Sequence, residues 1–311
     1  MIIITDSIRF AEKSFGTIAG WKRLAATPNK IEHTGLLIEL YRRSPLYIGE
    51  IQFDPLWHYA FVTEHSEDSQ FEVLKKYFKK HAAAKHGILC LAEKGTNFKG
   101  QRDRNWVTVA GNIHLSTYLN PAQKVGHFNL GFAILPVVSV LQAVDECSYV
   151  LSKAAIKWVN DVLIDGAKIA GALTQTQVSG ETVTGVISGI GINVETKPPA
   201  VADLVVAQAD CLNSYTQQGN EITLGEFLEK FLAKFSVNYK HILKGRYFDL
   251  LEIYRQRSAI VGRKITVLSD PINDRSKKVT EGIVRSIGEN LELFLENHHQ
   301  PVIRGRVVLN N

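Results

Sequence analysis

Four short stretches that lie close together in the chain decide its fold: Lys157-Trp158-Val159-Asn160-Asp161, Asp165-Gly166, Lys168-Ile169-Ala170-Gly171 and Gly189-Ile190-Gly191-Ile192-Asn193-Val194. We interpret them as a strand, a tight turn, a second strand and a third strand that ends in small residues. Asp165-Gly166 supplies the positive φ angles that a two-residue hairpin needs. Lys157 stands at the open end of this meander, where it can meet an anionic ligand. The glycines at 171, 189 and 191 let that ligand approach the backbone closely.

These stretches resemble the core of the biotin protein ligases. That family has a Lys-Trp-Pro-Asn-Asp segment, a Lys-(Ile/Leu)-(Ala/Gly)-Gly strand and a Gly-x-Gly-(Ile/Phe)-Asn-(Val/Met) strand, in the same order and at similar spacing. The resemblance covers about residues 55 to 311. It implies an α+β fold, in which a mixed-sheet, class II synthetase-like ligase domain precedes a small SH3-like β-barrel.

The composition is that of an ordinary globular protein, with 45% hydrophobic and 22% charged residues in a chain of 311. A net charge of +5 suits anionic ligands such as ATP, and because no DNA-binding motif accompanies it we expect no DNA partner. Three scattered cysteines predict no disulfide framework, and no Cys-x-x-Cys or His-x-x-x-His pair suggests a metal site. There is no signal-peptide pattern, and the longest apolar run, residues 130–141, is too short to cross a bilayer. We therefore expect a cytoplasmic protein with no membrane contact.

The chain divides into three predicted parts. Residues 1–54 form an extension of unknown role, with strands expected at 1–5 and 47–53 and an apolar run at 35–41. We expect the extension to pack on the next part, and a recognition module for partners is the alternative. No helix-turn-helix pattern is evident there, so we expect no DNA binding. Residues 55–257 are the catalytic domain, and residues 258–311 are the barrel.

Local patterns predict the elements of the second and third parts. We expect helices at 71–80 and 130–145 and strands at 87–92 and 112–118. Thr223 and Glu226 predict a capping box, followed by a helix that buries Phe227, Phe231 and Phe235 on one face. Four short strands separated by glycine turns, at 264–268, 279–286, 291–296 and 302–308, predict the small barrel.

A basic loop at residues 92–106 follows a buried strand and ends at Trp106. Basic side chains and backbone amides in such a loop can close over phosphates. In the family this place holds a Gly-(Arg/Lys)-Gly-(Arg/Gln)-(Arg/Gly)-Gly loop that orders over biotin and the adenylate. Lys99, Gly100, Gln101 and Arg102 match that pattern. Phe98 and Asp103 stand where the family has glycine, and Gly95 stands where many members have a glutamine that contacts biotin.

The expected biotin end of the site begins at Asp68-Ser69-Gln70-Phe71, where the family has an Asp-Ser-Thr-Asn turn into a helix. Ser69 matches the serine that binds the ureido ring, whereas Gln70 and Phe71 depart from the pattern. A shifted alignment through Ser66 is an alternative. A serine before a helix is otherwise an ordinary N-cap residue.

The resemblance implies a ligase that uses ATP and Mg²⁺ to convert biotin to biotinyl-5′-AMP, and transfers it to a lysine of a biotin carboxyl carrier protein domain. It implies Lys157 and Arg102 as catalytic groups. The implied biotin contacts are Ser69, Gln70, Gly95, Lys99, Gly100, Gln101, Lys157 and Gly171. The implied ATP contacts are Lys99, Arg102, Arg104, Trp106, Asn160 and Asn193, of which Asn193 bonds the adenine.

Two other functions stay open at this point. The altered Gln70 and Gly95 allow a ligase of the same fold for lipoate or another carboxylic acid. A degenerate homologue would bind its ligand without turnover. The oligomeric state is also open, because an exposed strand could either form a homodimer or dock the acceptor protein.

Overall fold

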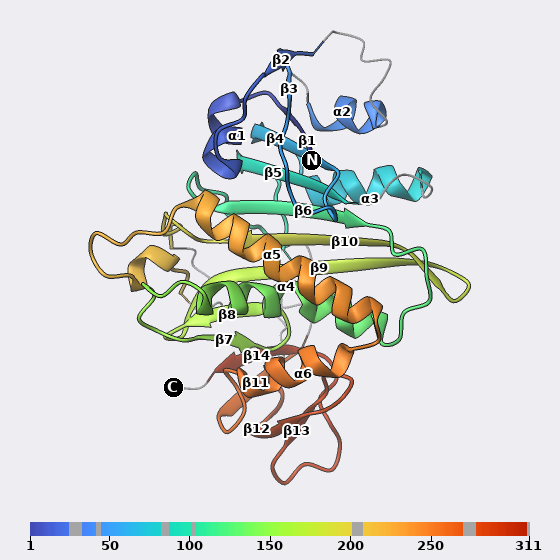
Figure 1. The fold of residues 1–311 in the computed structure, drawn as a ribbon. Coiled ribbons are helices and arrows are strands. Elements are labelled where there is room, and N and C mark those ends of the chain that lie inside the picture. The colour runs from blue at the N-terminus through green and yellow to red at the C-terminus, as the bar shows by residue number, and fades with distance from the viewer. Residues whose placement is uncertain are drawn as a thin grey trace.

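A ten-stranded mixed sheet forms the body of the protein in the computed structural model (Figure 1). The structure describes residues 1–24, 33–41, 45–81, 87–100, 104–200, 208–269 and 278–309. The strand order is β2-β3-β1-β4-β5-β6-β10-β9-β8-β7. The strands are β1 (Ile2–Thr5), β2 (Lys22–Arg23), β3 (Tyr47–Glu50), β4 (Tyr59–Ser66), β5 (Ile88–Gly95), β6 (Ile113–Leu119), β7 (Ala154–Lys157), β8 (Asp161–Ile164), β9 (Ala167–Ser179) and β10 (Thr182–Ile192).

The N-terminal residues extend this sheet. β1 pairs in parallel with β4 and antiparallel with β3, so the expected strands at 1–5 and 47–53 lie in the same sheet as the strands of the next part. The apolar run at 35–41 is a helix, α2 (Thr34–Leu40), that buries Leu36, Leu37 and Leu40. The division of the chain at residue 54 stays a prediction.

Helices cover both faces of the sheet. They are α1 (Ile8–Phe15), α3 (Gln70–Lys80), α4 (Phe128–Asp145), α5 (Leu224–Leu243) and α6 (Tyr247–Gln256), with a short 3₁₀ helix at Leu212–Tyr215. Because successive strand residues point to opposite faces, Ile3 packs in the core under α1, α4 and α5, whereas Ile4 packs with α2 and α3. On the α3 face, β10 continues from Ile187 to Gly189 and Gly191, and a cavity opens over these two glycines.

The two long helices follow their sequence patterns. Thr223 Oγ1 accepts a hydrogen bond from Glu226 N at 3.2 Å, and Phe227, Phe231 and Phe235 are fully buried. Helix α4 is long and apolar enough to cross a membrane by composition. Most of it is buried, however, and it packs against β9 and α5 as the core helix of a folded domain does.

The stretch at 157–161 is not the continuous strand that the sequence predicted. Lys157 pairs directly with Asp161, so the chain reverses between them and forms β7 and β8. Partners elsewhere in the fold hold this reversal: Trp158 Nε1 donates to Leu291 O at 2.6 Å and Tyr254 Oη donates to Val159 O at 3.0 Å. The Asp-Gly turn is confirmed, with positive φ at both Asp165 and Gly166.

A second, antiparallel sheet follows α6, with the order β13-β12-β11-β14, as the sequence predicted for an SH3-like unit. Its strands are β11 (Lys264–Leu268), β12 (Lys278–Ile287), β13 (Leu293–Leu295) and β14 (Arg306–Leu309). Its inner residues Ile265, Val267, Val284 and Val307 join the core that also contains α4 and α6. The last strand begins four residues later than expected, and Val302 forms only an isolated bridge to Leu293.

Candidate functional site

The cavity has a volume of about 510 Å³ and lies over β6, β8, β9 and β10. Apolar side chains of Phe71, Leu173 and Ile190 line part of it, and the charged side chains of Lys99, Arg104 and Lys168 line another. Its size is that of a typical small-molecule site. A ligand with an apolar part and an anionic part matches these two kinds of lining.

A group of four charged residues, which we call the cation cluster, lies beside the cavity: Lys157, Asp161, Lys168 and Arg104. Lys168 Nζ is 2.6 Å from Asp161 Oδ1 and 5.5 Å from the centre of the Trp106 ring. This pair lies over Gly171, where a Cβ atom would come within 2.9 Å of Lys168 Nζ and 3.3 Å of Asp161 Oδ1. The backbone glycine therefore leaves room for the ion pair.

Burial shapes the charge of Lys157 and Asp161. The Lys157 side chain is buried, and burial lowers its pKa, although the neighbouring Asp161 carboxylate acts in the opposite direction. Burial alone would raise the pKa of Asp161, but Lys168, Lys157 and Arg104 outweigh it and the net direction is down. The cluster thus holds three cationic side chains around one ionised carboxylate, and an anionic ligand would favour the charged form of Lys157.

The basic loop is a short hairpin at the rim. Lys99 and Asn105 form a bridge, Gly100 N donates to Arg104 O at 2.7 Å, and Trp106 N donates to Phe98 O at 2.8 Å. Its tip, with the predicted Gln101 and Arg102 and the departure at Asp103, lies outside the described residues. The hairpin brings Lys99, Gly100 and Arg104 to the cavity.

Trp106 joins the loop to the sheet. Its ring lies against Gly191, where a Cβ atom would come within 2.1 Å of Trp106 Cζ2, and its Nε1 donates to His114 Nδ1 at 3.2 Å. His114 Nε2 lies 3.2 Å from both Val109 N and Val109 O. If Nδ1 accepts from Trp106, the proton of a neutral ring is on Nε2, which then donates to Val109 O. Burial lowers the pKa of His114 to about 4, so this ring is neutral near neutral pH.

The comparison with known protein families decides the class of this site. The model of the biotin/lipoate A/B protein ligase family matches residues 64–193, which hold most of the cavity lining and the cation cluster. These residues form a biotin/lipoate A/B protein ligase domain. The resemblance to the biotin protein ligases is confirmed.

Individual relatives agree with this ligase domain. The chain is 33% identical over 161 residues, half of its own length, to the "Bifunctional ligase/repressor BirA" of Bacillus subtilis, and 38% identical over 107 residues, a third of its length, to the "Biotin--[acetyl-CoA-carboxylase] ligase" of Paracoccus denitrificans. These alignments span 47% and 43% of the two relatives, so the chain matches about half the length of each. A biotin protein ligase from Aquifex aeolicus, solved with biotin and ATP, has the same fold, with a TM-score of 0.60 at 19% identity over 81% of this chain and 98% of that one.

Most of the predicted contacts of the ligase domain line the cavity. They are Ser69, Lys99, Gly100, Arg104, Trp106, Asn160, Gly171 and Asn193. Asn160 Nδ2 donates to Ala172 O, and Asn193 Nδ2 donates to Asp210 O at 2.9 Å, so both amides tie neighbouring segments together. The roles of these residues toward a ligand stay predictions.

Three predicted contacts among the described residues do not belong to the lining. Lys157 is buried behind the cavity in the cation cluster. Gln70 is fully buried, and its Nε2 donates to Thr63 Oγ1 at 3.3 Å. Gly95 lies beneath the Phe98 ring, where a Cβ atom would be 2.4 Å from Phe98 Cε2. Phe98 itself lines the cavity, which explains why a small residue stands at 95.

Sequence reasoning missed several residues of the ligase domain's site. Lys168 belongs to a motif that the sequence offered, yet its ion pair with Asp161 depends on a reversal at 158–160 that no local pattern indicated. His114 lay in a predicted strand as one polar residue among alternating ones. Pro198, Pro199 and Ala200 line the cavity from a segment without any motif.

Proposed function

We propose that the chain is an ATP-dependent biotin–protein ligase, which activates biotin as biotinyl-5′-AMP and transfers it to a lysine of a biotin carboxyl carrier domain. The observation that supports this most is the cation cluster next to a cavity with an apolar part, within a domain of the matched family. An apolar ring system with a carboxylate tail, together with a triphosphate, fits these two kinds of surface.

The first step joins the biotin carboxylate to the α-phosphate of ATP and releases pyrophosphate. Two anions must approach each other, and negative charge spreads over the phosphate oxygens as the new bond forms. Fixed cations at that point lower the barrier because they are already oriented. Lys157 would bridge the carboxylate and the α-phosphate, with Lys168 and Arg104 beside it, and Arg102 and Lys99 would neutralise the phosphates from the loop.

In the second step a lysine amine of the acceptor protein attacks the acyl carbon of the mixed anhydride. The bond to the AMP oxygen breaks, AMP leaves, and the amine nitrogen loses a proton as the amide forms. Charge develops on the acyl oxygen, and we assign its stabilisation to Lys157 together with Lys168, which lines the cavity.

Mg²⁺ would accompany the triphosphate. Among the described residues, no group of three His, Cys, Asp or Glu side chains could hold a metal ion, and Asp161 is engaged by Lys168. The phosphate oxygens and water would therefore provide most of the ligands of the ion, as is usual for Mg²⁺. It would neutralise phosphate charge and favour pyrophosphate as the leaving group.

A second substrate class deserves a direct test. The cavity wall near Ser69 is formed by Phe71, Phe98 and Leu173, whereas Gln70 and Gly95 lie away from it. An apolar wall of this kind also suits the chain and ring of lipoate. The proposal also includes a biotin carboxyl carrier domain as the partner protein and a cytoplasmic location. A homodimer is possible.

The decisive experiment mixes the purified chain with biotin, Mg-ATP and a biotin carboxyl carrier domain, and detects the labelled carrier with streptavidin. We expect labelling that requires ATP and is lost when the acceptor lysine of the carrier is replaced by arginine. Pyrophosphate release is followed in parallel with biotin, lipoate and octanoate. Pyrophosphate release with lipoate but not with biotin would mean that lipoate is the substrate. Release with none of the three acids would contradict the proposal.

A further inference from the structure

The wall of the cavity next to Asn193 is a segment without regular secondary structure. We call residues 193–200 the 193–200 wall; it follows β10, and Asn193, Pro198, Pro199 and Ala200 line the cavity. Backbone hydrogen bonds hold its first residues, among them Asn193 N to Ile169 O at 2.8 Å and Asn213 N to Val194 O at 3.1 Å, and two side chains add to them.

Asn112 holds the wall from below. This fully buried residue precedes β6; its Oδ1 accepts from Val194 N at 2.9 Å and from Thr196 N at 3.1 Å, and its Nδ2 donates to Thr196 O at 2.8 Å. Thr196 Oγ1 donates in turn to Ala110 O at 2.9 Å. One amide side chain thus bonds three backbone groups of the wall.

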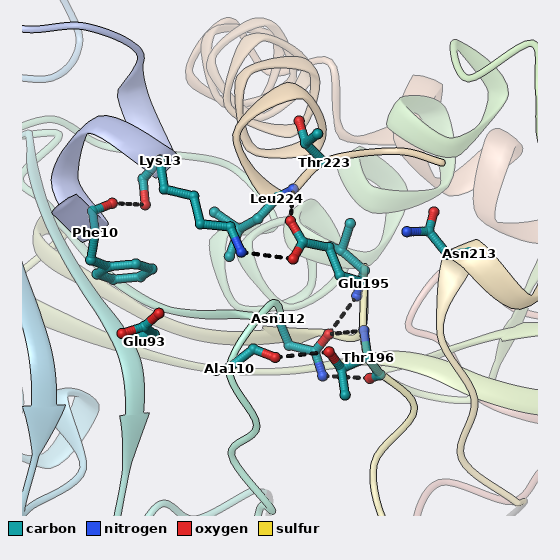
Figure 2. Close-up of polar contacts among 12 residues, drawn as sticks. Phe10, Lys13, Glu93, Ala110, Asn112, Glu195, Thr196, Asn213, Thr223 and Leu224 are labelled. Carbon is teal, nitrogen blue, oxygen red and sulfur yellow. Dashed lines mark hydrogen bonds and ion pairs between the residues drawn. The ribbon is translucent and has the colours of Figure 1, made fainter. Parts of the chain in front are cut away.

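Glu195 holds the wall from above, where two helices meet (Figure 2). Its Oε2 is 2.7 Å from Lys13 Nζ of α1, and its Oε1 accepts from Leu224 N of α5 at 2.8 Å. Leu224 is the first residue of α5, so this amide has no partner inside the helix, and a carboxylate at that end is favoured by the helix dipole.

The two helices are packed tightly at this point. A Cβ atom on Gly225, in the first turn of α5, would come within 2.5 Å of Lys13 O. Glu195 N also donates to Gly111 O at 3.1 Å, so its backbone and its side chain are both fixed. The N-terminal extension pairs with the sheet through β1, and the Glu195 carboxylate connects it in addition to the 193–200 wall.

We propose that Glu195 is a positioning residue for the nucleotide, and that Lys13 of the extension acts through it. The inference rests on the proposed function and on the predicted contact of Asn193 with the adenine. Lys13 and the N-terminus of α5 fix Glu195, Glu195 and Asn112 fix the 193–200 wall, and the wall sets the affinity for ATP. The biotin end, near Ser69 and Phe71, is formed by other elements and does not depend on this connection.

The test measures ATP and biotin binding separately by calorimetry, which needs no turnover, in Lys13→Met, Glu195→Gln and Glu195→Ala. Glu195→Gln keeps an acceptor for Leu224 N and loses the ion pair, whereas Glu195→Ala loses both. We expect the Kd for ATP to rise about 2- to 5-fold in Lys13→Met and Glu195→Gln and about 10-fold in Glu195→Ala, with the Kd for biotin within about 2-fold of wild type. The double variant Lys13→Met/Glu195→Ala should bind ATP like Glu195→Ala alone, because Lys13 acts only through Glu195.

The control is Lys124→Met, which breaks the exposed pair between Lys124 and Glu181 at 2.9 Å and should change neither Kd. A fall in melting temperature with equal losses for ATP and biotin would mean that Glu195 is merely structural, and overturn the inference. If wild type labels the carrier domain while Glu195→Ala binds ATP normally, the inference fails and the proposed function stands. If Glu195→Ala weakens ATP binding but the wild-type chain never labels a carrier domain, the inference stands and the proposed function fails. A wild type that binds no ATP overturns both.

Discussion

The two sides of the cavity hold their cations in different ways. On the sheet side, Lys157 and Lys168 stand on strands whose ladders run through ten strands, and Lys168 is fixed against Asp161 at 2.6 Å. On the loop side, Lys99 and Arg104 stand on a hairpin that the two backbone hydrogen bonds of one isolated bridge close, with Trp106 as its anchor on the sheet. The sheet side is oriented before a ligand arrives, whereas the described part of the loop joins the sheet through one isolated bridge and the Trp106 ring. Preorganised charge contributes most to lowering a barrier, so the sheet side should dominate the chemistry and the loop side the retention of the ligand.

Lys157→Ala is the variant with the largest expected effect, and it tests whether the sheet side dominates the chemical step. Removal of one preorganised donor typically slows the chemical step by about 10²–10³-fold, and we expect that loss in biotin-dependent pyrophosphate release under saturating substrates. Lys153→Ala, an exposed lysine four residues earlier, is the matched control and should leave the rate unchanged. An unchanged rate in Lys157→Ala would mean that the chemistry belongs to the loop side or elsewhere.

Trp106 and His114 connect the loop side to the sheet side, and this contact can be tested through the pH dependence of stability. The pKa of His114 is lowered from 6.5 to about 4, so between these values the unfolded chain takes up a proton that the folded chain does not. The free energy of unfolding should therefore fall as the pH decreases from 6.5 toward 4, and His114 should account for up to about 3 kcal/mol of that fall. Urea unfolding of wild type and His114→Gln across this range isolates the contribution, because other groups titrate alike in both. Parallel curves would contradict a buried neutral imidazole.

Gly191→Ala tests the packing of the Trp106 ring on the sheet. A Cβ atom would have to displace the Trp106 ring, which lies 2.1 Å from its position, and overpacking of this kind costs about 1–3 kcal/mol. We expect a lower free energy of unfolding and weaker ATP binding as the loop moves from the sheet. Gly126→Ala, where nothing lies within 4 Å, serves as the control. Normal binding in Gly191→Ala would show that the loop side does not need its anchor.

Trp106→Phe should have the smallest effect. It keeps an aromatic ring at the position but removes the hydrogen bond from Nε1 to His114, whose net value is about 1 kcal/mol, and the distal ring atoms Cζ2 and Cη2 next to Gly191. The expected result is a Kd for ATP raised about 5-fold with an unchanged rate of the chemical step. A slower chemical step at saturating ATP would mean that the loop orients the reacting groups and does more than retain the ligand.

The sequence predicted the parts of the protein whose signals are local. The Asp-Gly turn, the helix behind Thr223, the strand at 264–268 and the three ligase motifs all depend on neighbouring residues, and the structure contains each of them. Lys99, Gly100, Arg104 and Trp106 line the cavity for the same reason, since one hairpin contains them.

What the sequence could not predict depends on distant partners. The reversal at 158–160 is stabilised by Leu291 O and the Tyr254 hydroxyl, which lie far along the chain. The Lys168–Asp161 pair exists only because of that reversal. In the same way, Glu195 has no motif around it, and its contacts to Lys13 and Leu224 come from elements that only the folded chain brings together.

The hydrogen bond from the Trp158 indole to Leu291 O has a consequence for any attempt to divide the protein. A fragment that ends at residue 257 would retain the cavity lining yet lose the acceptor for that indole, and with it the acceptors of Tyr247 Oη and Arg255 Nε, which are Glu289 O and Ile287 O. Buried donors without acceptors are costly, so the shortened chain should not keep Lys157 in place. The last 54 residues therefore cannot be exchanged freely between proteins, and we expect a protease that removes them to inactivate the chain without cutting the segments that line the cavity.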